Sequence, residues 1–417
     1  VLNAVASAVG SATPPPPDAS LMANAGLDSL GAVELRARLG AVAGVDLAAT
    51  FVFDHPSPRA MAAGLAAAVR KARGREGVAG AGAAALPLPL APLARSLPLP
   101  PASQPAIEAV ASCARLPGVA ASAWDAVTAP NAVGVVPLDR WDGDATFDPH
   151  AGSFGGSHSG VRTPSYTRFG AWLGGPGGGG GAYGVDGAAL GLAPAEAVAT
   201  DPQARLFLEV GAAALAAGEE GAARASAPAA STSIHRPSTA VFVGAMYHEY
   251  LDLLLQHSGG GAANTTAAAP PQAITGAGPS FLVGRAAFSL GLGGPAAATD
   301  TACSSSLVAV HFGASALRAR EASAALVGGV NLMLRPETTA AVCALGALSP
   351  AGRCRSLDAG ADGYGRGEGC AALMLRSVGG ASTAVPTGAL LLLATAVNHG
   401  GRAAGLTAPS GPAQTGL

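Results

Sequence analysis

One thiol and the serines that follow it are the residues in this sequence best suited to covalent chemistry. Cys303 lies in residues 300–307 (Asp-Thr-Ala-Cys-Ser-Ser-Ser-Leu), after a Gly- and Ala-rich approach. The apolar residues beyond it recur with helical spacing, so we predict that a strand ends and a helix begins at the thiol. The positive end of that helix favours a thiolate, which is a nucleophile. The alternative is a small buried hydrophobe, although three consecutive serines are poor core material.

A hydroxyl stands at a second predicted helix start, in the first seventy residues. Ser29 precedes apolar residues that follow a helical period, and a further helix is signalled by Ser57 as N-cap, Pro58 at its first position and Met61 inside it. The remaining apolar positions of these two helices are Leu30, Val33, Leu35, Ala37, Leu39, Val42, Leu65 and Ala68. We predict a small helical bundle. A phosphate on Ser29 would meet free N–H donors, and the alternative is that Ser29 only caps its helix.

Composition limits the classes of partner. The 24 basic and 26 acidic residues nearly balance, so bulk charge argues against a nucleic-acid partner. Five cysteines without a Cys-x-x-Cys pair argue against a disulfide framework or a zinc site and favour a reducing, cytoplasmic compartment. No apolar run is long enough to cross a bilayer and no signal peptide is evident, so a soluble protein is expected.

The segments that must position the thiol and the hydroxyl are predicted to be two modules, 1–70 and 107–417. Residues 71–106 are rich in Ala, Gly, Pro and Leu and are interpreted as a flexible tether that spans roughly 30–36 Å as a coil. In the second module short apolar strands alternate with helices, which predicts an α/β layered fold. The strands are expected at 240–243, 325–330, 371–375 and, buried, 390–393, and the helices at 204–217 and 304–320. Residues 174–181, 219–237 and 256–273 are expected to be disordered insertions.

Residues 300–307 resemble the active-site signature of the β-ketoacyl synthase domains of polyketide synthases and type I fatty acid synthases. Further landmarks of those domains occur in the family's order at 137–142, 201–206, 241–244, 328–331, 352–358 and 363–369. Residues 26–30 (Gly-Leu-Asp-Ser-Leu) and 51–56 (Phe-Val-Phe-Asp-His-Pro) resemble acyl carrier protein domains. Together these resemblances imply a fragment of a modular polyketide synthase, with a four-helix carrier bundle ahead of a thiolase-like α/β domain that is expected to be a homodimer.

The resemblance also implies roles for both reactive residues. Ser29 would carry phosphopantetheine as a phosphodiester. Cys303 would take the acyl chain as a thioester, with backbone N–H groups at the helix start stabilising the oxyanion. Acyl and malonyl-type thioesters and other domains of the same synthase are the implied partners. Gly363–Gly369 is interpreted as a structural turn near the site.

Condensation in this family needs two histidines, in His-Gly-Thr-Gly-Thr and Asn-x-Gly-His motifs, and neither motif occurs in the 417 residues. We therefore expect a β-ketoacyl synthase domain truncated before them, which accepts an acyl group without condensing it. His311 is interpreted as a packing or surface residue of the Cys303 helix, and His399 as a loop landmark. The alternatives are a type I fatty acid synthase segment and a non-catalytic acyl-binding module in which Cys303 is only packed.

Overall fold

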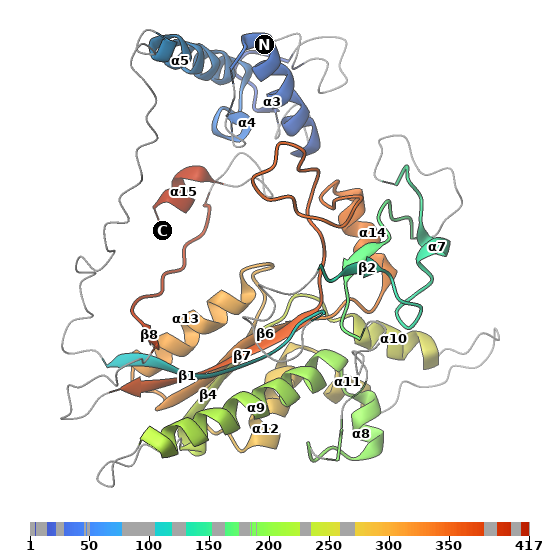
Figure 1. Cartoon of the computed structure of the whole chain (residues 1–417), viewed down its shortest axis with the longest axis vertical. Coiled ribbons are helices and arrows are strands. Elements are labelled where there is room, and N and C mark those ends of the chain that lie inside the picture. Colours follow the sequence, from blue (N-terminus) through green and yellow to red (C-terminus); the bar gives the residue numbers. More distant parts are fainter. Residues whose placement is uncertain are drawn as a thin grey trace. The chain divides into compact units, whose positions relative to one another are not determined.

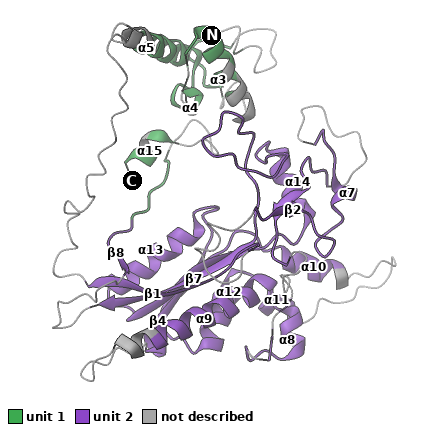
Figure 2. Cartoon of the chain, viewed as in Figure 1, with its two compact units in different colours: residues 1–97, 396–417 green, residues 98–395 purple. Residues whose placement is uncertain are grey.

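The computed structural model divides into two compact units, residues 1–97 with 396–417 and residues 98–395 (Figures 1 and 2). The structure describes residues 5, 15–21, 29–45, 47, 51–76, 105–118, 131–151, 163–174, 184, 186–188, 190–225, 235–258, 272–378, 390–401 and 410–416.

The first unit is helical and has its own small core. Its helices are α3 (Ser29–Ala43), α4 (Phe51–Asp54), α5 (Pro58–Glu76) and α15 (Gly411–Thr415). The core includes Leu35, Leu39, Phe51 and Met61. The predicted cap of the second helix is confirmed, because the Ser57 hydroxyl accepts a hydrogen bond from the Ala60 N–H at 3.3 Å.

Two predictions for this unit need correction. Val42 was expected on the apolar surface of its helix, but it is 86% exposed. Helix α5 runs on to Glu76, so residues 71–76 of the predicted tether are helical, and β1 begins at its last residue, Ala106. Residues 77–104 of the tether, and the side chains of Ser29, Leu30, Val33 and Ala37, lie outside the described part of the structure.

The second unit is built on a six-stranded mixed sheet in the order β5-β4-β6-β7-β1-β8. Its strands are β1 (Ala106–Arg115), β4 (Thr239–Gly244), β5 (Ala296–Thr299), β6 (Ala324–Asn331), β7 (Gly369–Val378) and β8 (Leu390–Leu392). Strand β4 pairs in parallel with β5 and β6, whereas β7 pairs antiparallel with β6 and β1. A separate hairpin pairs β2 (Val133–Val135) with β3 (Phe169–Ala171).

Helices cover both faces of the large sheet, as Figure 1 shows. Alternate residues of β4 point to opposite sides: Val241 and Val243 pack against α9 (Pro202–Ala225) and α12 (Pro279–Leu290), and Ala240 and Phe242 pack against α13 (Ser305–Arg318). The other helical segments are α7 (Gly143–Thr146), α8 (Pro194–Ala199), η1 (Arg236–Ser238), α10 (Glu249–Ser258), α11 (Ala273–Gly276) and α14 (Pro336–Ala344). The predicted α/β layered fold is confirmed.

The predicted strands at 240–243, 325–330 and 371–375 lie inside β4, β6 and β7. The expectation of a buried strand at 390–393 is wrong, because β8 is an edge strand and Leu390 is 69% exposed. The predicted insertions are also partly ordered: residues 219–225 belong to α9 and 256–258 to α10, while 175–183, 226–234 and 259–271 lie outside the described residues.

Candidate active site around Cys303

Cys303 lies in the tight turn between β5 and α13, and its side chain is exposed. The turn depends on Ala302, whose φ of 56° places it in the left-handed region. The Asp300 carboxylate accepts a hydrogen bond from the Ala302 N–H at 2.9 Å. The Ser305 hydroxyl donates to the Ala302 carbonyl at 2.6 Å and accepts from the Thr301 N–H at 2.8 Å. These bonds hold the thiol just ahead of the helix, as the sequence predicted.

Small residues bring α13 close to the sheet below the thiol. A Cβ atom on Gly244, the last residue of β4, would lie 2.4 Å from the Ser305 carbonyl carbon. A Cβ on Gly329 of β6 would lie 2.7 Å from the Ser306 Cβ. The buried face of the helix is Ser305, Val308, Ala309, Gly313, Ala314, Ala316 and Leu317. Leu307 is 73% exposed, whereas Val308, Ala314 and Leu317 are buried, so the apolar spacing that predicted the helix marks its buried face only in part.

Cys303 lines a pocket of about 800 Å³, a volume typical of small-molecule sites. Four stretches of chain form its walls: residues 244–247 beyond β4, residues 302–307 around the thiol, residues 328–331 at the end of β6, and residues 364–371 leading into β7. The predicted turn at 363–369 therefore contributes directly to the pocket. Leu307, Val310 and Leu373 add apolar surface, which suits an aliphatic chain next to the thiol.

Two titratable side chains near the turn have shifted pKa values. Burial is the main cause that raises the pKa of Tyr364, a wall residue of the pocket. Burial also lowers the pKa of His248, and the charge of Asp300 opposes that shift. The His248 Nδ1 is buried without a hydrogen-bond partner among the described residues. The sequence gives no indication of His248, because one histidine between two apolar segments carries no spacing signal.

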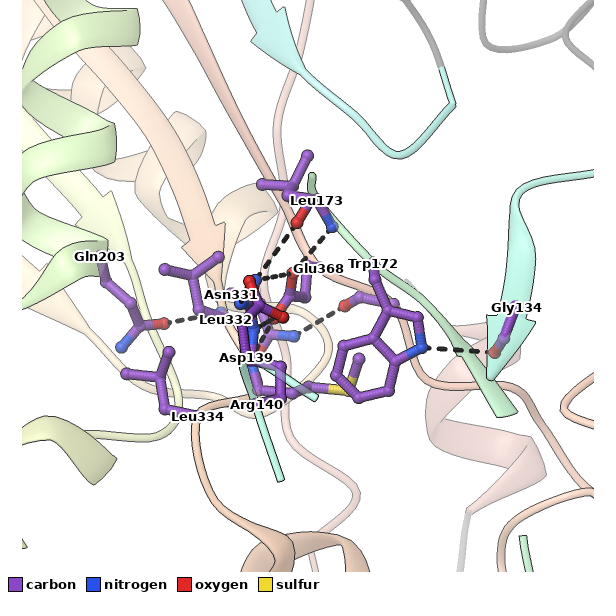
Figure 3. Close-up of polar contacts among 12 residues, drawn as sticks. Gly134, Asp139, Arg140, Trp172, Leu173, Gln203, Asn331, Leu332, Leu334 and Glu368 are labelled. Carbon is purple, nitrogen blue, oxygen red and sulfur yellow. Dashed lines mark hydrogen bonds and ion pairs between the residues drawn. The ribbon is translucent and has the colours of Figure 1, made fainter. Parts of the chain in front are cut away.

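A buried ion pair supports the wall at residues 364–371. Glu368 accepts two hydrogen bonds from Arg140, at 3.0 and 2.9 Å, and both side chains are fully buried. The Leu173 N–H, at 2.8 Å, and the Met333 N–H, at 3.1 Å, also donate to this carboxylate. Figure 3 shows Arg140, Leu173 and Glu368 converging. The charge is therefore paired and fully hydrogen-bonded, which a buried carboxylate requires.

His311 belongs to α13 and lies eight residues beyond Cys303 in the sequence. The His311 Nδ1 is 2.9 Å from the Thr395 hydroxyl, which confirms its interpretation as a packing residue. His399 accepts a hydrogen bond from the Gly401 N–H in the first unit. Ser29, also in the first unit, is the first residue of α3. Cys343 and Cys370 are buried, and burial raises the pKa of Cys370, whereas Cys354 is exposed like Cys303.

Metal binding and membrane insertion have no support in the described residues. No group of three or more His, Cys, Asp or Glu side chains there is arranged to hold a metal ion. In the same part of the chain no helix combines the length and apolar character that crossing a bilayer requires.

Family models match both parts of the sequence. Residues 110–381 match the family model described as the β-ketoacyl synthase N-terminal domain. Residues 1–65 match the model described as a phosphopantetheine attachment site.

Curated relatives and solved structures agree with these matches. A phenolphthiocerol/phthiocerol polyketide synthase protein of Mycobacterium tuberculosis is 39% identical over 304 residues, which are 70% of this chain and 17% of that protein. Polyketide synthase GfsA of Streptomyces halstedii is 37% identical over 394 residues, 93% of this chain and 5% of that protein. The ketosynthase from module 6 of the Bacillus subtilis bacillaene synthase aligns with a TM-score of 0.56 and 30% identity over 75% of this chain and 47% of that one. The chain thus spans less than a fifth of these curated relatives.

Proposed function

This chain belongs to the β-ketoacyl synthase family, and from that premise we propose that Cys303 accepts an acyl group from a thioester. The observation that supports this most directly is the exposed thiol beyond the end of β5, lining a pocket that apolar side chains also line. A packed, inert Cys303 is disfavoured by the same exposure. The proposal extends to a segment of a modular polyketide synthase, since the named relatives are polyketide synthases.

The reaction is a thioester exchange without net oxidation. The Cys303 sulfur, after losing its proton, attacks the carbonyl carbon of the acyl thioester, and a new carbon–sulfur bond forms. The bond from that carbon to the donor sulfur breaks, and the departing thiolate takes up a proton. Backbone N–H groups in the first turn of α13 are the candidate donors to the oxyanion that develops on the carbonyl oxygen.

The first unit contains the phosphopantetheine attachment domain, and we propose that Ser29 is the residue that bears the cofactor. Residues 1–65 are a phosphopantetheine attachment domain, and Ser29 supplies the hydroxyl that a phosphodiester needs, at the first position of α3. Backbone N–H groups at a helix start suit a phosphate. When bound, phosphopantetheine supplies a terminal thiol that can hold an acyl chain as a thioester.

The assignment of Ser29 predicts a defined mass change. Incubation of the whole chain with coenzyme A and a phosphopantetheinyl transferase should add one phosphopantetheine, located on the peptide that contains Ser29. Ser29→Ala should add none, whereas Ser57→Ala, which removes a cap hydroxyl from α5, should load like the wild type. Loading of the Ser29→Ala protein would contradict the assignment.

We further propose that these 417 residues by themselves accept an acyl chain and do not condense it, because the two histidine motifs of the family do not occur in them. The protein, given an acyl thioester and a malonyl thioester, should give acyl-enzyme and no sustained ketoacyl product. Steady formation of ketoacyl product would refute this part. We also propose that the second unit forms a homodimer. A cytoplasmic location is proposed as well, because the five cysteines are free.

A further inference from the structure

The chain segment that leaves the sheet after β6 has no strand beside it, yet it is buried. Leu332, Met333 and Leu334 are each at most 2% exposed, and the segment ends where α14 begins at Pro336. Buried N–H groups without a strand partner need other acceptors, or each costs the free energy of a lost hydrogen bond. The acceptors here are side chains.

Three buried side chains meet this need, and each binds the segment 332–335. Gln203 accepts from the Leu332 N–H at 3.1 Å, and Glu368 accepts from the Met333 N–H at 3.1 Å. One oxygen of Glu249 accepts from the next two N–H groups, Leu334 at 2.7 Å and Arg335 at 2.8 Å. Four consecutive backbone donors are thus satisfied by side chains from three distant parts of the chain. Figure 3 shows Gln203 directed at Leu332 and Glu368 beside it.

Each of these side chains is joined to a wall of the Cys303 pocket. Glu249 closely follows the wall 244–247, and Glu368 belongs to the wall 364–371. Gln203 is outside the pocket, but its amide donates to the carbonyl of the wall residue Tyr247. Residues 328–331, the third wall, run straight into the segment, and the Asn331 amide donates to the Gly367 carbonyl at 2.7 Å.

We propose that three walls of the pocket are held to one buried segment, residues 332–335, by the positioning residues Gln203, Glu249 and Glu368. This inference rests on the proposed acyl transfer to Cys303 and adds which residues set the shape of its binding space. None of the three needs to touch the reacting atoms. Their loss should therefore impair substrates that fill the pocket and spare small reagents that need only the exposed thiol.

Gln203 gives the sharpest test, because the side chain is itself uncharged. Gln203→Met keeps the length of the side chain and removes its hydrogen bonds to Leu332 and Tyr247 and its contact with the Asp201 carboxyl. The matched control is Glu108→Gln, which weakens another buried pair, that of Glu108 with Arg376 at 2.9 Å, at the far end of β7. The midpoints of thermal unfolding of both variants show how much each substitution destabilises the protein. A change in the acylation rate can then be compared between variants of known stability.

The experiment follows the modification of Cys303 by mass spectrometry, with an octanoyl thioester of N-acetylcysteamine and with iodoacetamide. Gln203→Met should slow octanoylation about ten-fold or more, a size expected for a displaced binding wall, and should change iodoacetamide labelling less than about two-fold. The control should match the wild type with both reagents. A parallel loss of both rates, or no change in either, would overturn the proposal.

Hydrogen exchange separates failure of this inference from failure of the proposed function. In Gln203→Met the peptides that cover 245–248 and 332–335 should exchange faster than in Glu108→Gln, whether or not the wild type accepts octanoate. Unchanged exchange in those peptides would overturn the proposed positioning role. If Gln203→Met does not fold, Gln203→Asn is the second variant: it is also uncharged and too short to reach both Leu332 and Tyr247, so faster exchange at 245–248 and 332–335 is expected there as well.

Discussion

At the scale of single residues, the candidate site depends on the exposed Cys303 thiol and on the left-handed backbone conformation of the residue before it. Ala302 has a φ of 56°, a conformation that costs a non-glycine residue about 1–2 kcal/mol. The Asp300 carboxylate and the Ser305 hydroxyl both bind Ala302, so these polar contacts offset the cost. In the proposed reaction, this turn holds Cys303 ready for attack before any substrate arrives.

This geometry predicts the effect of substitutions at Ala302. Ala302→Val places a β-branched side chain in the left-handed region, so it should destabilise the unit by about 1–2 kcal/mol and slow acylation of Cys303. Ala302→Gly accepts the same φ and should retain most of the rate. Thermal unfolding and timed mass spectrometry measure both. Equal acylation by the Val and Gly variants would mean that the strained turn does not position the thiol.

Residue motifs pointed to candidate reactive groups, but not to the side chains that support the pocket. The serine run and the helical spacing after it pointed to Cys303, whose turn the structure contains. Gln203 and Glu368 lie within the landmark segments 201–206 and 363–369, but the sequence did not indicate their contacts with 332–335, because a side chain that accepts from a backbone N–H leaves no periodic signal. Glu249 was missed for the same reason, whereas His248 was missed because a single histidine carries no spacing signal.

At the scale of elements, the approach of α13 to the sheet determines where the thiol lies. Gly244 and Gly329 leave no room for a side chain below the first turn of this helix. Because β4 and β6 are parallel neighbours in the middle of the sheet, the helix start rests on rigid backbone. The position of Cys303 is therefore a property of the packing between α13 and the sheet.

Adding one methyl group at this contact should move the helix. Gly244→Ala puts a Cβ 2.4 Å from the Ser305 carbonyl carbon, so we expect a loss of about 1–3 kcal/mol in the free energy of unfolding and slower acylation of Cys303. Gly284→Ala is the control, because that glycine is exposed in α12 with open space around it, and alanine should stabilise the helix by about 0.5–1 kcal/mol. Chemical denaturation measures both, and a neutral Gly244→Ala would contradict the close packing.

The sequence pattern predicted central elements well and peripheral ones poorly. Strands β4, β6 and β7 were predicted because central strands are buried on both faces and read as apolar runs. The run at 390–393 looks the same in sequence, although β8 has a strand on one side only. In α13 the small residues Ser305, Ala309 and Gly313 face the sheet, and Leu307 faces the pocket, so hydrophobicity alone does not identify the buried face.

At the scale of the whole molecule, stability should depend on pH through Asp201. Burial raises the pKa of this carboxyl to about 6, and the hydrogen bond from the Gln203 N–H opposes the shift. Between the ordinary carboxyl pKa and about 6 the folded chain binds more protons than the unfolded chain. The stabilising contribution of protonated Asp201 is therefore present at low pH and is lost as pH rises through about 6.

The direction of this pH dependence of stability can be tested with Asp201→Asn, which mimics the protonated carboxyl. The stability of the wild type, relative to this variant, should fall by roughly 2–3 kcal/mol between pH 4 and pH 7 and stay level above pH 7. Denaturation curves for both proteins across that range provide the measurement. A relative stability that rises with pH would contradict the assignment.

We propose that the two units serve one chemistry, with a hydroxyl for the cofactor in the first and a nucleophilic thiol in the second. The most direct test of the account is peptide mass spectrometry of the whole chain after brief exposure to an acyl thioester. We expect one acyl group on the peptide that contains Cys303, none in Cys303→Ala, and wild-type labelling in Cys354→Ala, which removes the other exposed thiol. A bare Cys303, or equal labelling of Cys303 and Cys354, would contradict the central claim.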